Sequence, residues 1–300
     1  MTNPLFKALP SDFNKQDFIA FHHRDEHEVA ERYADNVIEK GLIWGAYPAR
    51  LCFDFNDVNR VQVSLHCDAE KASIDSAKLS QLADHMLGLD QRIEAFERFC
   101  SRQNTPFSHL VQQQKGLRIP QSASPFEAFS WAIIGQQISV KAAISIRRRF
   151  IQTFGMEHSS GLLCYPTAES LQHATPESLQ ASGLSNSKAA TLLLLAEHIC
   201  QQKLVWPSQL DHTIIGAFSK QLLALKGIGP WTVSYGLLRG FGWLDGSLHG
   251  DVAVRRHLSS LLATPTVMDA KATEQWLADY APWRALAGAH LWAMGSASGY

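Results

Sequence analysis

Residues 222–232 read LLALKGIGPWT, and Asp251 follows further along the chain. The string puts two glycines and a proline after an apolar helical pattern, which indicates a helix, a tight hairpin and a second helix. Glycine tolerates positive φ and lets bare backbone approach a ligand, and Pro230 presets φ at the first position of the second helix. A helix start favours an anion, so the hairpin can hold one nucleic-acid phosphate without a basic side chain. The candidate donors are the backbone N–H groups of Gly227, Gly229 and Trp231.

This segment resembles the helix-hairpin-helix of the DNA glycosylase superfamily. That motif reads L-x-x-L-x-G-[IV]-G and is followed, after a loop, by a catalytic Asp, and residues 222–229 match every defined position. A Gly-x-Gly pair alone is weak evidence, so the surrounding context decides the interpretation. The resemblance implies that Asp251 is catalytic and that the hairpin contacts DNA. The expected DNA-binding residues in it are Lys226, Gly227, Gly229 and Thr232.

Trp231 indicates the branch of the superfamily. Members with lyase activity carry a nucleophilic Lys at this position, which forms a Schiff base with the sugar, and an indole cannot perform that chemistry. Those members often carry a terminal iron–sulfur loop with four cysteines, whereas the last cysteine of this chain is Cys200. We therefore expect neither lyase activity nor an iron–sulfur cluster.

Three further segments resemble the alkylbase branch, the bacterial DNA-3-methyladenine glycosylase II (AlkA-type) family. Residues 126–139 (FEAFSWAIIGQQIS) are similar to its F-E-x-x-x-x-A-I-x-G-Q-x-x-S helix and turn, 250–256 (GDVAVRR) to G-D-x-x-x-R-R, and 282–284 (PWR) to P-W-R. The likeness spans nearly the whole chain and is weakest before about residue 42. It implies a monofunctional enzyme that flips alkylated bases of the 3-methyladenine and 7-methylguanine type out of duplex DNA. The enzyme then hydrolyses the N-glycosidic bond, as in base excision repair.

The resemblance also implies a base-binding pocket. Trp231, Tyr235 and Trp292 match family positions that line it, and Phe21 can form a further wall. Stacking on such rings is worth ~1–3 kcal/mol per base, with an added cation–π attraction for a charged base. Core packing is the alternative role for these rings. Gln137 stands where the best-known family member inserts an apolar wedge, and an amide can fill the gap and hydrogen-bond the orphaned base.

The resemblance to the superfamily also extends to a structural cation bound at the hairpin. The resemblance implies a monovalent or divalent ion held by the backbone carbonyls of Leu223, Leu225 and Ile228, with no ligand from side chains. No other cofactor is expected.

Asp251 also has a simpler interpretation. It precedes the helical pattern of residues 252–262, and an Asp in that position is commonly only an N-cap. The family spacing from the hairpin favours a catalytic role, which capping supports, since N–H donors favour the ionised carboxylate. A carboxylate beside C1′ stabilises the oxocarbenium cation that develops as a charged, alkylated purine leaves. A preorganised contact of this kind lowers the barrier by ~3–4 kcal/mol.

Composition and patterning predict the fold. The 300 residues exceed a usual single core of ~100–200 residues, and 46% are hydrophobic. Residues 51–55 and 61–65 alternate apolar and polar side chains across a turn, which predicts two antiparallel strands. We therefore predict a mainly α chain of helix-hairpin-helix DNA glycosylase architecture. An N-terminal α+β sub-domain with an antiparallel sheet spans residues 1–115, and an all-helical region spans 116–300, with the hairpin at about 217–240.

Charge is unevenly distributed along the chain. Residues 1–110 carry 12 Lys and Arg against 17 Asp and Glu, a net charge of −5, whereas residues 111–300 carry 15 against 11, a net charge of +4. The second part contains the hairpin, and its modest positive charge predicts few phosphate contacts and a shallow salt dependence. Three consecutive arginines at 147–149 fit either a phosphate patch or a solvated helix end.

The sequence also predicts where the protein works. No run of roughly 18 apolar residues is present, and the N-terminal MTNP lacks the basic and apolar regions of a signal peptide. Five cysteines without paired spacing fit reduced thiols. We expect a cytoplasmic, nucleoid-associated monomer that binds double-stranded DNA containing alkylated bases and does not contact a membrane.

Two other functions stay open on the sequence alone. One is a non-catalytic helix-hairpin-helix protein that only grips DNA phosphates, although such a protein has no use for Asp251 or an aromatic pocket. The other is a glycosylase for oxidised or deaminated bases, because the shape of the pocket sets which base is accepted.

Overall fold

The computed structural model describes residues 4–69 and 74–295. A five-stranded antiparallel sheet forms its N-terminal part, with the strands in the order β1-β5-β4-β3-β2. Residues 51–55 and 61–65 lie mainly in β4 and β5, which pair antiparallel with Leu51 opposite Leu65, so the two predicted strands are confirmed. The strands are β1 (Leu5–Ala8), β2 (Glu31–Ala34), β3 (Val37–Trp44), β4 (Tyr47–Asp54) and β5 (Arg60–Cys67).

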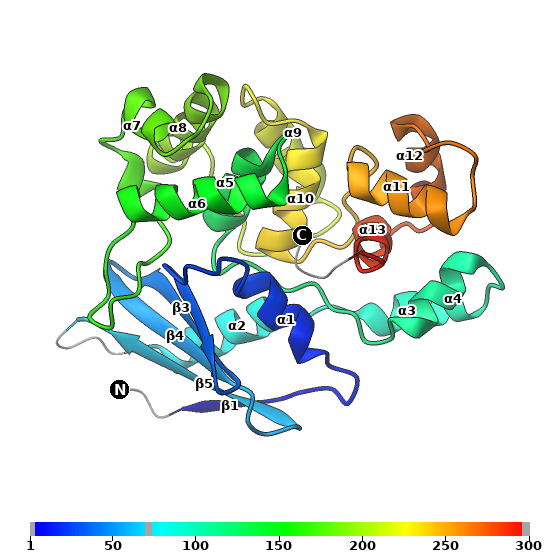
Figure 1. Cartoon of the computed structure of the whole chain (residues 1–300), viewed down its shortest axis with the longest axis horizontal. Helices are drawn as coiled ribbons and strands as arrows, with labels where there is room; N and C mark the ends of the chain where they lie inside the picture. Colours follow the sequence, from blue (N-terminus) through cyan, green and yellow to red (C-terminus); the bar gives the residue numbers. More distant parts are fainter. Residues whose placement is uncertain (1–3, 70–73, 296–300) are drawn as a thin grey trace.

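Helices make up most of the remaining chain, which confirms the predicted fold class. Figure 1 shows the sheet with α1 and α2 below α5 to α10, and α3 and α4 reaching across to α11 to α13. Within the described residues, no helix is both long and apolar enough to cross a bilayer. The helices are α1 (Lys15–His22), α2 (Ser76–Leu87), α3 (Ile93–Ser101), α4 (Pro106–Gln113), α5 (Pro125–Gly135), α6 (Val140–Phe154), α7 (Pro176–Ala181), α8 (Asn186–Cys200), α9 (Ile214–Leu223), α10 (Pro230–Phe241), α11 (Val252–Leu261), α12 (Ala270–Ala278) and α13 (Arg284–Trp292), with a 3₁₀ turn η1 (Glu169–Leu171).

Helices α5 and α10 pack against each other at the centre of the helical part. Gly236 of α10 faces the ring of Phe129, and a Cβ atom at Gly236 would lie 2.5 Å from that ring. The absence of a side chain therefore lets the two helices approach closely. This contact matters for function because α5 leads into the turn at Gln137 and α10 begins at the hairpin.

The described residues form two hydrophobic cores. The smaller core joins the sheet to α1 and α2 and ends at Leu87. Helices α3 and α4, assigned from the sequence to the N-terminal sub-domain, share the larger core with the C-terminal helices. Phe96 of α3 lies 5.9 Å from the ring of Trp283, and Phe107 of α4 lies 4.9 Å from that of Trp276. The two helices therefore support the helical part.

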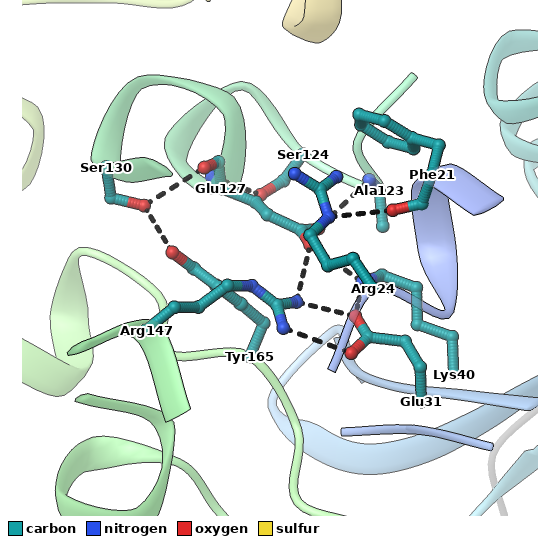
Figure 2. A network of polar contacts seen from close by, with 10 residues as sticks. All are labelled: Phe21, Arg24, Glu31, Lys40, Ala123, Ser124, Glu127, Ser130, Arg147 and Tyr165. Atoms are coloured by element: carbon teal, nitrogen blue, oxygen red, sulfur yellow. Dashed lines mark hydrogen bonds and ion pairs between the residues drawn. The ribbon is translucent and has the colours of Figure 1, made fainter. Parts of the chain in front are cut away.

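A buried ion network joins the sheet to the helical part (Figure 2). Lys40 of β3 donates to Glu31 of β2 at 2.6 Å and to Glu127 of α5 at 2.7 Å. Arg147 of α6 holds the same Glu31 through two bonds, at 2.6 and 3.1 Å. Burial alone raises the pKa of Glu31, but the charges and hydrogen bonds of Arg147 and Lys40 outweigh it and hold that pKa well below its ordinary value. Glu31 therefore stays ionised at the junction of the two parts.

Candidate active site

Asp251 is the N-cap of α11, as the sequence pattern predicts. Its Oδ1 accepts the backbone N–H groups of Ala253 at 2.9 Å and Val254 at 3.0 Å. The residue is only 4% exposed. The start of α11 therefore fixes both the position and the orientation of this carboxylate.

Two indole groups donate to the same carboxylate. Trp231 Nε1 lies 2.9 Å from Oδ2, and Trp292 Nε1 lies 3.2 Å from Oδ1. All four donors to Asp251 are neutral, and among the described residues no Lys, Arg or His forms an ion pair with it. The negative charge is therefore held without a protein cation to neutralise it, which suits a group that stabilises a developing cation.

The predicted aromatic residues lie together beside Asp251. The rings of Trp231 and Tyr235 stack with centroids 5.2 Å apart and an interplanar angle of 30°, and Tyr235 lies 6.1 Å from Trp292. Trp231 and Tyr235 line a cavity of about 830 Å³ together with Asp251, whereas Trp292 is 7% exposed and reaches the site through its hydrogen bond. Tyr235 is 1% exposed and stacks against Trp231, so it backs the wall of the cavity, which presents the Trp231 ring and the Asp251 carboxylate to a ligand.

Phe21 lies behind this wall, between two arginines. The guanidinium groups of Arg24 and Arg239 stand 4.1 and 4.3 Å from its ring centroid. Arg24 also stacks at 4.6 Å on Trp131, which lines the cavity. Burial lowers the pKa of Arg239 to about 10, so it stays protonated at neutral pH. Sequence reasoning did not anticipate these cations, because nothing local places Arg24 or Arg239 beside an aromatic ring.

The hairpin has the expected helix start but uses its glycines differently. Gly227 adopts a φ of +92°, and a Cβ there would lie 1.9 Å from Thr191 Oγ1, so the site requires glycine. Gly229 is the N-cap of α10 with a φ of −101° and has open space where a Cβ would stand. Gly229 therefore does not use a left-handed conformation, and it leaves the helix start uncovered. Lys226, which directly precedes Gly227, is exposed to solvent.

Thr232 and Gln136 hold the hairpin in place. Thr232 is buried, and its Oγ1 accepts from Gln136 Nε2 at 2.9 Å, while the same nitrogen donates to Gly227 O at 3.0 Å. The Thr232 side chain therefore positions the hairpin, and only its backbone belongs to the helix start. Sequence reasoning did not assign a role to Gln136, although it is the Q of the G-Q-x-x-S motif.

Gln137 occupies an exposed turn that also lines the cavity. Its φ of +56° lies in the left-handed region, which is uncommon for a residue with a side chain and is often found at functional sites. Ile138 next to it is 37% exposed. Gln137 and Ile138 line the same cavity as Gly229, Trp231 and Asp251, so the structure brings these predicted site residues together.

The carbonyls predicted to hold a cation lie around the hairpin. In the described chain, no backbone N–H outside the helices and strands donates to the carbonyl oxygen of Leu223 or Ile228, and that of Leu225 accepts from Ile228 N at 3.0 Å. Oxygen atoms with free lone pairs suit a hard cation. The three carbonyls therefore keep the lone pairs that such an ion would need.

The chain is similar to known DNA repair proteins. A family model described as HhH-GPD superfamily base excision DNA repair protein matches residues 130–282. DNA-3-methyladenine glycosylase 2 of Escherichia coli (strain K12) is 31% identical over 72% of this chain and 74% of its own. DNA-3-methyladenine glycosylase of Bacillus subtilis (strain 168) is 22% identical over 77% of both chains.

Solved structures share the fold. The 3-methyladenine DNA-glycosylase from Archaeoglobus fulgidus superposes with a TM-score of 0.81 at 21% identity, covering 97% of this chain and 98% of that one. An 8-oxoguanine glycosylase/lyase from Clostridium acetobutylicum, in complex with double-stranded DNA, gives a TM-score of 0.72 at 14% identity, covering 98% and 95%.

Proposed function

The chain belongs to the HhH-GPD superfamily of base excision DNA repair proteins, and we propose that it is a monofunctional DNA glycosylase that removes alkylated bases from duplex DNA. The proposal rests on the surroundings of Asp251. Its buried carboxylate lines an aromatic cavity, and four neutral hydrogen-bond donors hold it there. The two relatives described above are named DNA-3-methyladenine glycosylases, which supports 3-methyladenine as a substrate. The positive charge that 7-methylguanine shares with 3-methyladenine extends the proposal to that base.

Residues of the cavity have a role in each step of the proposed reaction, from base flipping to the attack of water. A damaged base leaves the duplex at a cost of a few kcal/mol, which stacking on Trp231, backed by Tyr235, offsets. The alkylated purine is positively charged and leaves without protonation by the enzyme. As the C1′–N bond breaks, Asp251 stabilises the cation on the sugar and orients or deprotonates the water that attacks the opposite face.

The hairpin and the Gln137 turn hold the DNA in this proposal. The N–H groups at the start of α10 bind a phosphate, and exposed Lys226 adds a positive charge near the backbone. Gln137 enters the gap left by the flipped base, with the exposed Ile138 beside it. A monovalent or divalent ion on the carbonyls of Leu223, Leu225 and Ile228 would stiffen the hairpin, and no other cofactor is required.

The experiment that selects among the candidate functions is mass spectrometry of the free bases released from alkylated, oxidised and deaminated duplex DNA. We expect 3-methyladenine and 7-methylguanine from the alkylated DNA without added metal or nucleotide. Release from only the oxidised or deaminated DNA would reassign the pocket. Tight binding to all three without any free base would identify a non-catalytic DNA-binding protein.

Base release should occur without strand cleavage. Trp231 occupies the position of the Schiff-base Lys, and its indole N–H already donates to Asp251. Borohydride added during turnover should therefore trap no protein–DNA adduct. A covalent adduct that survives denaturation would contradict the monofunctional assignment.

Gly229→Asp should separate stability from DNA binding. The open space at Gly229 accommodates a side chain, and Asp is a favoured N-cap, so the melting temperature should stay the same or rise. The same carboxylate repels the phosphate at the helix start, so affinity for duplex DNA should fall about tenfold or more, ~1.4 kcal/mol. Gly229→Asn is the matched neutral control and should bind nearly as well as wild type. Equal affinities for the Asp and Asn variants would exclude a phosphate at this helix start.

A further inference from the structure

The segment between α6 and η1 fastens the helical part to the sheet. Leu163 N donates to Val29 O at 2.8 Å, and Arg32 Nη1 donates to Ser160 O at 3.1 Å. A Cβ atom on Gly41 of β3 would lie 2.3 Å from the Leu163 carbonyl oxygen, so the segment lies directly against the sheet. At the end of β5 this contact brings His158 to the side chains of His66 and Asp68.

These three side chains point metal-binding atoms at one another. His66 Nδ1 lies 3.0 Å from His158 Nε2, which lies 3.3 Å from Asp68 Oδ1, and one ligand atom of each residue falls within 4.8 Å of the others. Ligands of a tetrahedral zinc ion, each about 2.0–2.1 Å from the metal, stand roughly 3.3–3.4 Å apart. The His66–His158 and His158–Asp68 distances lie within a few tenths of an ångström of this separation, and the His66 and Asp68 atoms, at most 4.8 Å apart, must approach by up to about 1.5 Å. Rotation of the His66 and Asp68 side chains, neither of which is fully buried, therefore completes a coordination site.

We propose that His66, Asp68 and His158 bind a divalent transition-metal ion, Zn²⁺ above all, which clamps the sheet to the segment after α6. Two imidazoles and one carboxylate form a ligand set that zinc accepts readily, with water in the fourth position. Hard cations such as Mg²⁺ prefer oxygen ligands, so two imidazole nitrogens select against them. Asp68 has a side chain 24% exposed, which gives the ion access from solvent.

The surroundings support the three ligands. Ser159 donates to Asp68 through its N–H at 2.8 Å and its hydroxyl at 2.7 Å, which fixes the carboxylate. Ser160 Oγ lies 2.8 Å from His158 Nδ1, on the far side of the ring from Nε2. Outer contacts of this kind orient the ligands of protein metal sites.

Metal binding requires one proton to move. In the metal-free ring, His158 Nδ1 accepts the Ser160 N–H at 3.1 Å, so Nε2 carries the proton that lies between the two histidines. When Nε2 binds the ion, the neutral ring carries its proton on Nδ1, and Ser160 Oγ is placed to accept it. The ion thus replaces the proton between the His66 and His158 rings. The backbone N–H of Ser160 then loses its acceptor on His158 and, because Ser160 is partly exposed, can donate to water instead.

The test uses the full-length, untagged protein after treatment with a chelator. Titration with Zn²⁺ in a calorimeter should show one equivalent bound, and Co²⁺ should produce visible absorption bands of a low-symmetry site. The melting temperature should rise with Zn²⁺ concentration, because the fold brings His158 to His66 and Asp68, which are far from it in sequence, and the ion binds only that folded arrangement.

Variants assign the binding to this cluster. His66→Gln and Asp68→Asn, both at positions that are not fully buried, should each weaken Zn²⁺ binding at least about tenfold and remove the thermal shift. His173→Gln, at an exposed histidine elsewhere, should change neither, and the five free cysteines are intact in all three variants. Wild-type protein that binds no Zn²⁺, or binding unchanged in both cluster variants, would overturn the proposal and leave a purely hydrogen-bonded clamp. The readouts do not involve base release, so they are independent of the glycosylase assignment.

Discussion

Asp251→Asn should lower the single-turnover rate of base release at least about 100-fold while changing affinity for abasic-site DNA by less than about threefold. The amide keeps the size of the side chain and removes the charge that faces the sugar cation. Its Oδ1 can still accept from the two N–H groups at the start of α11 and from Trp292. Its Nδ2 replaces the oxygen that accepts from Trp231. The new amide N–H and the Trp231 indole N–H then face each other without an acceptor between them. The helix cap therefore survives, and chemistry is the function that is lost.

The chain offers a matched control for this variant. Asp269 caps α12 in the same way, accepting from Ala272 N at 2.8 Å, and is not among the residues that line the cavity. Asp269→Asn should leave the rate of base release unchanged. If Asp251→Asn kept more than about a tenth of the wild-type rate, less than ~1.4 kcal/mol of barrier lowering would depend on the charge. Asp251 would then be a helix cap only.

Glu31→Gln should destabilise the folded chain by ~3–5 kcal/mol, the range seen when one partner of a buried ion pair is removed. The variant leaves Lys40 and Arg147 with Glu127 as their remaining carboxylate in the buried network. Denaturant unfolding measures the difference. Glu39→Gln is the matched control, because Glu39 forms a partly exposed ion pair with Arg50. This substitution should lower the free energy of unfolding by less than ~1 kcal/mol. Equal losses for the two variants would contradict the role given to the buried network.

The same variant should change the pH dependence of stability. The folded-state pKa of Glu31 lies below its ordinary value of 4.5, so its contribution is fully present above pH 4.5 and is lost as the pH falls toward the folded pKa. The difference in unfolding free energy between wild type and Glu31→Gln should therefore be constant near neutral pH and narrow below about pH 4.5. A constant difference down to pH 3 would mean that Glu31 does not carry this charge in the folded protein.

Features carried by contiguous sequence could be predicted. The hairpin, the strands around Leu51 and Leu65, and the cap at Asp251 follow from glycine, proline, alternation and capping rules that act over a few residues. The positions of Trp231 and Tyr235 beside Asp251 followed from family spacing, since the residues lie in segments that the motif already orders.

Features that depend on distant contacts could not be predicted. The three consecutive arginines do not act as one group, because Arg147 is buried against Glu31 and Arg148 pairs with buried Asp25, whereas Arg149 is exposed and also donates to the Ser182 carbonyl. No local pattern distinguishes a charge with a buried partner from one in water. Helices α3 and α4 join the larger core for the same kind of reason, since their partners lie near the C-terminus.

This chain should remove alkylated bases from DNA at Asp251. The most direct test of this activity is a time course of free 3-methyladenine, measured by mass spectrometry, from methylated duplex DNA with wild-type protein in excess, with Asp251→Asn and with no protein. Wild-type protein should release the base rapidly, and the variant should release it at nearly the spontaneous rate. Wild-type release no faster than the sample without protein, or equal release by wild type and variant, would contradict this prediction.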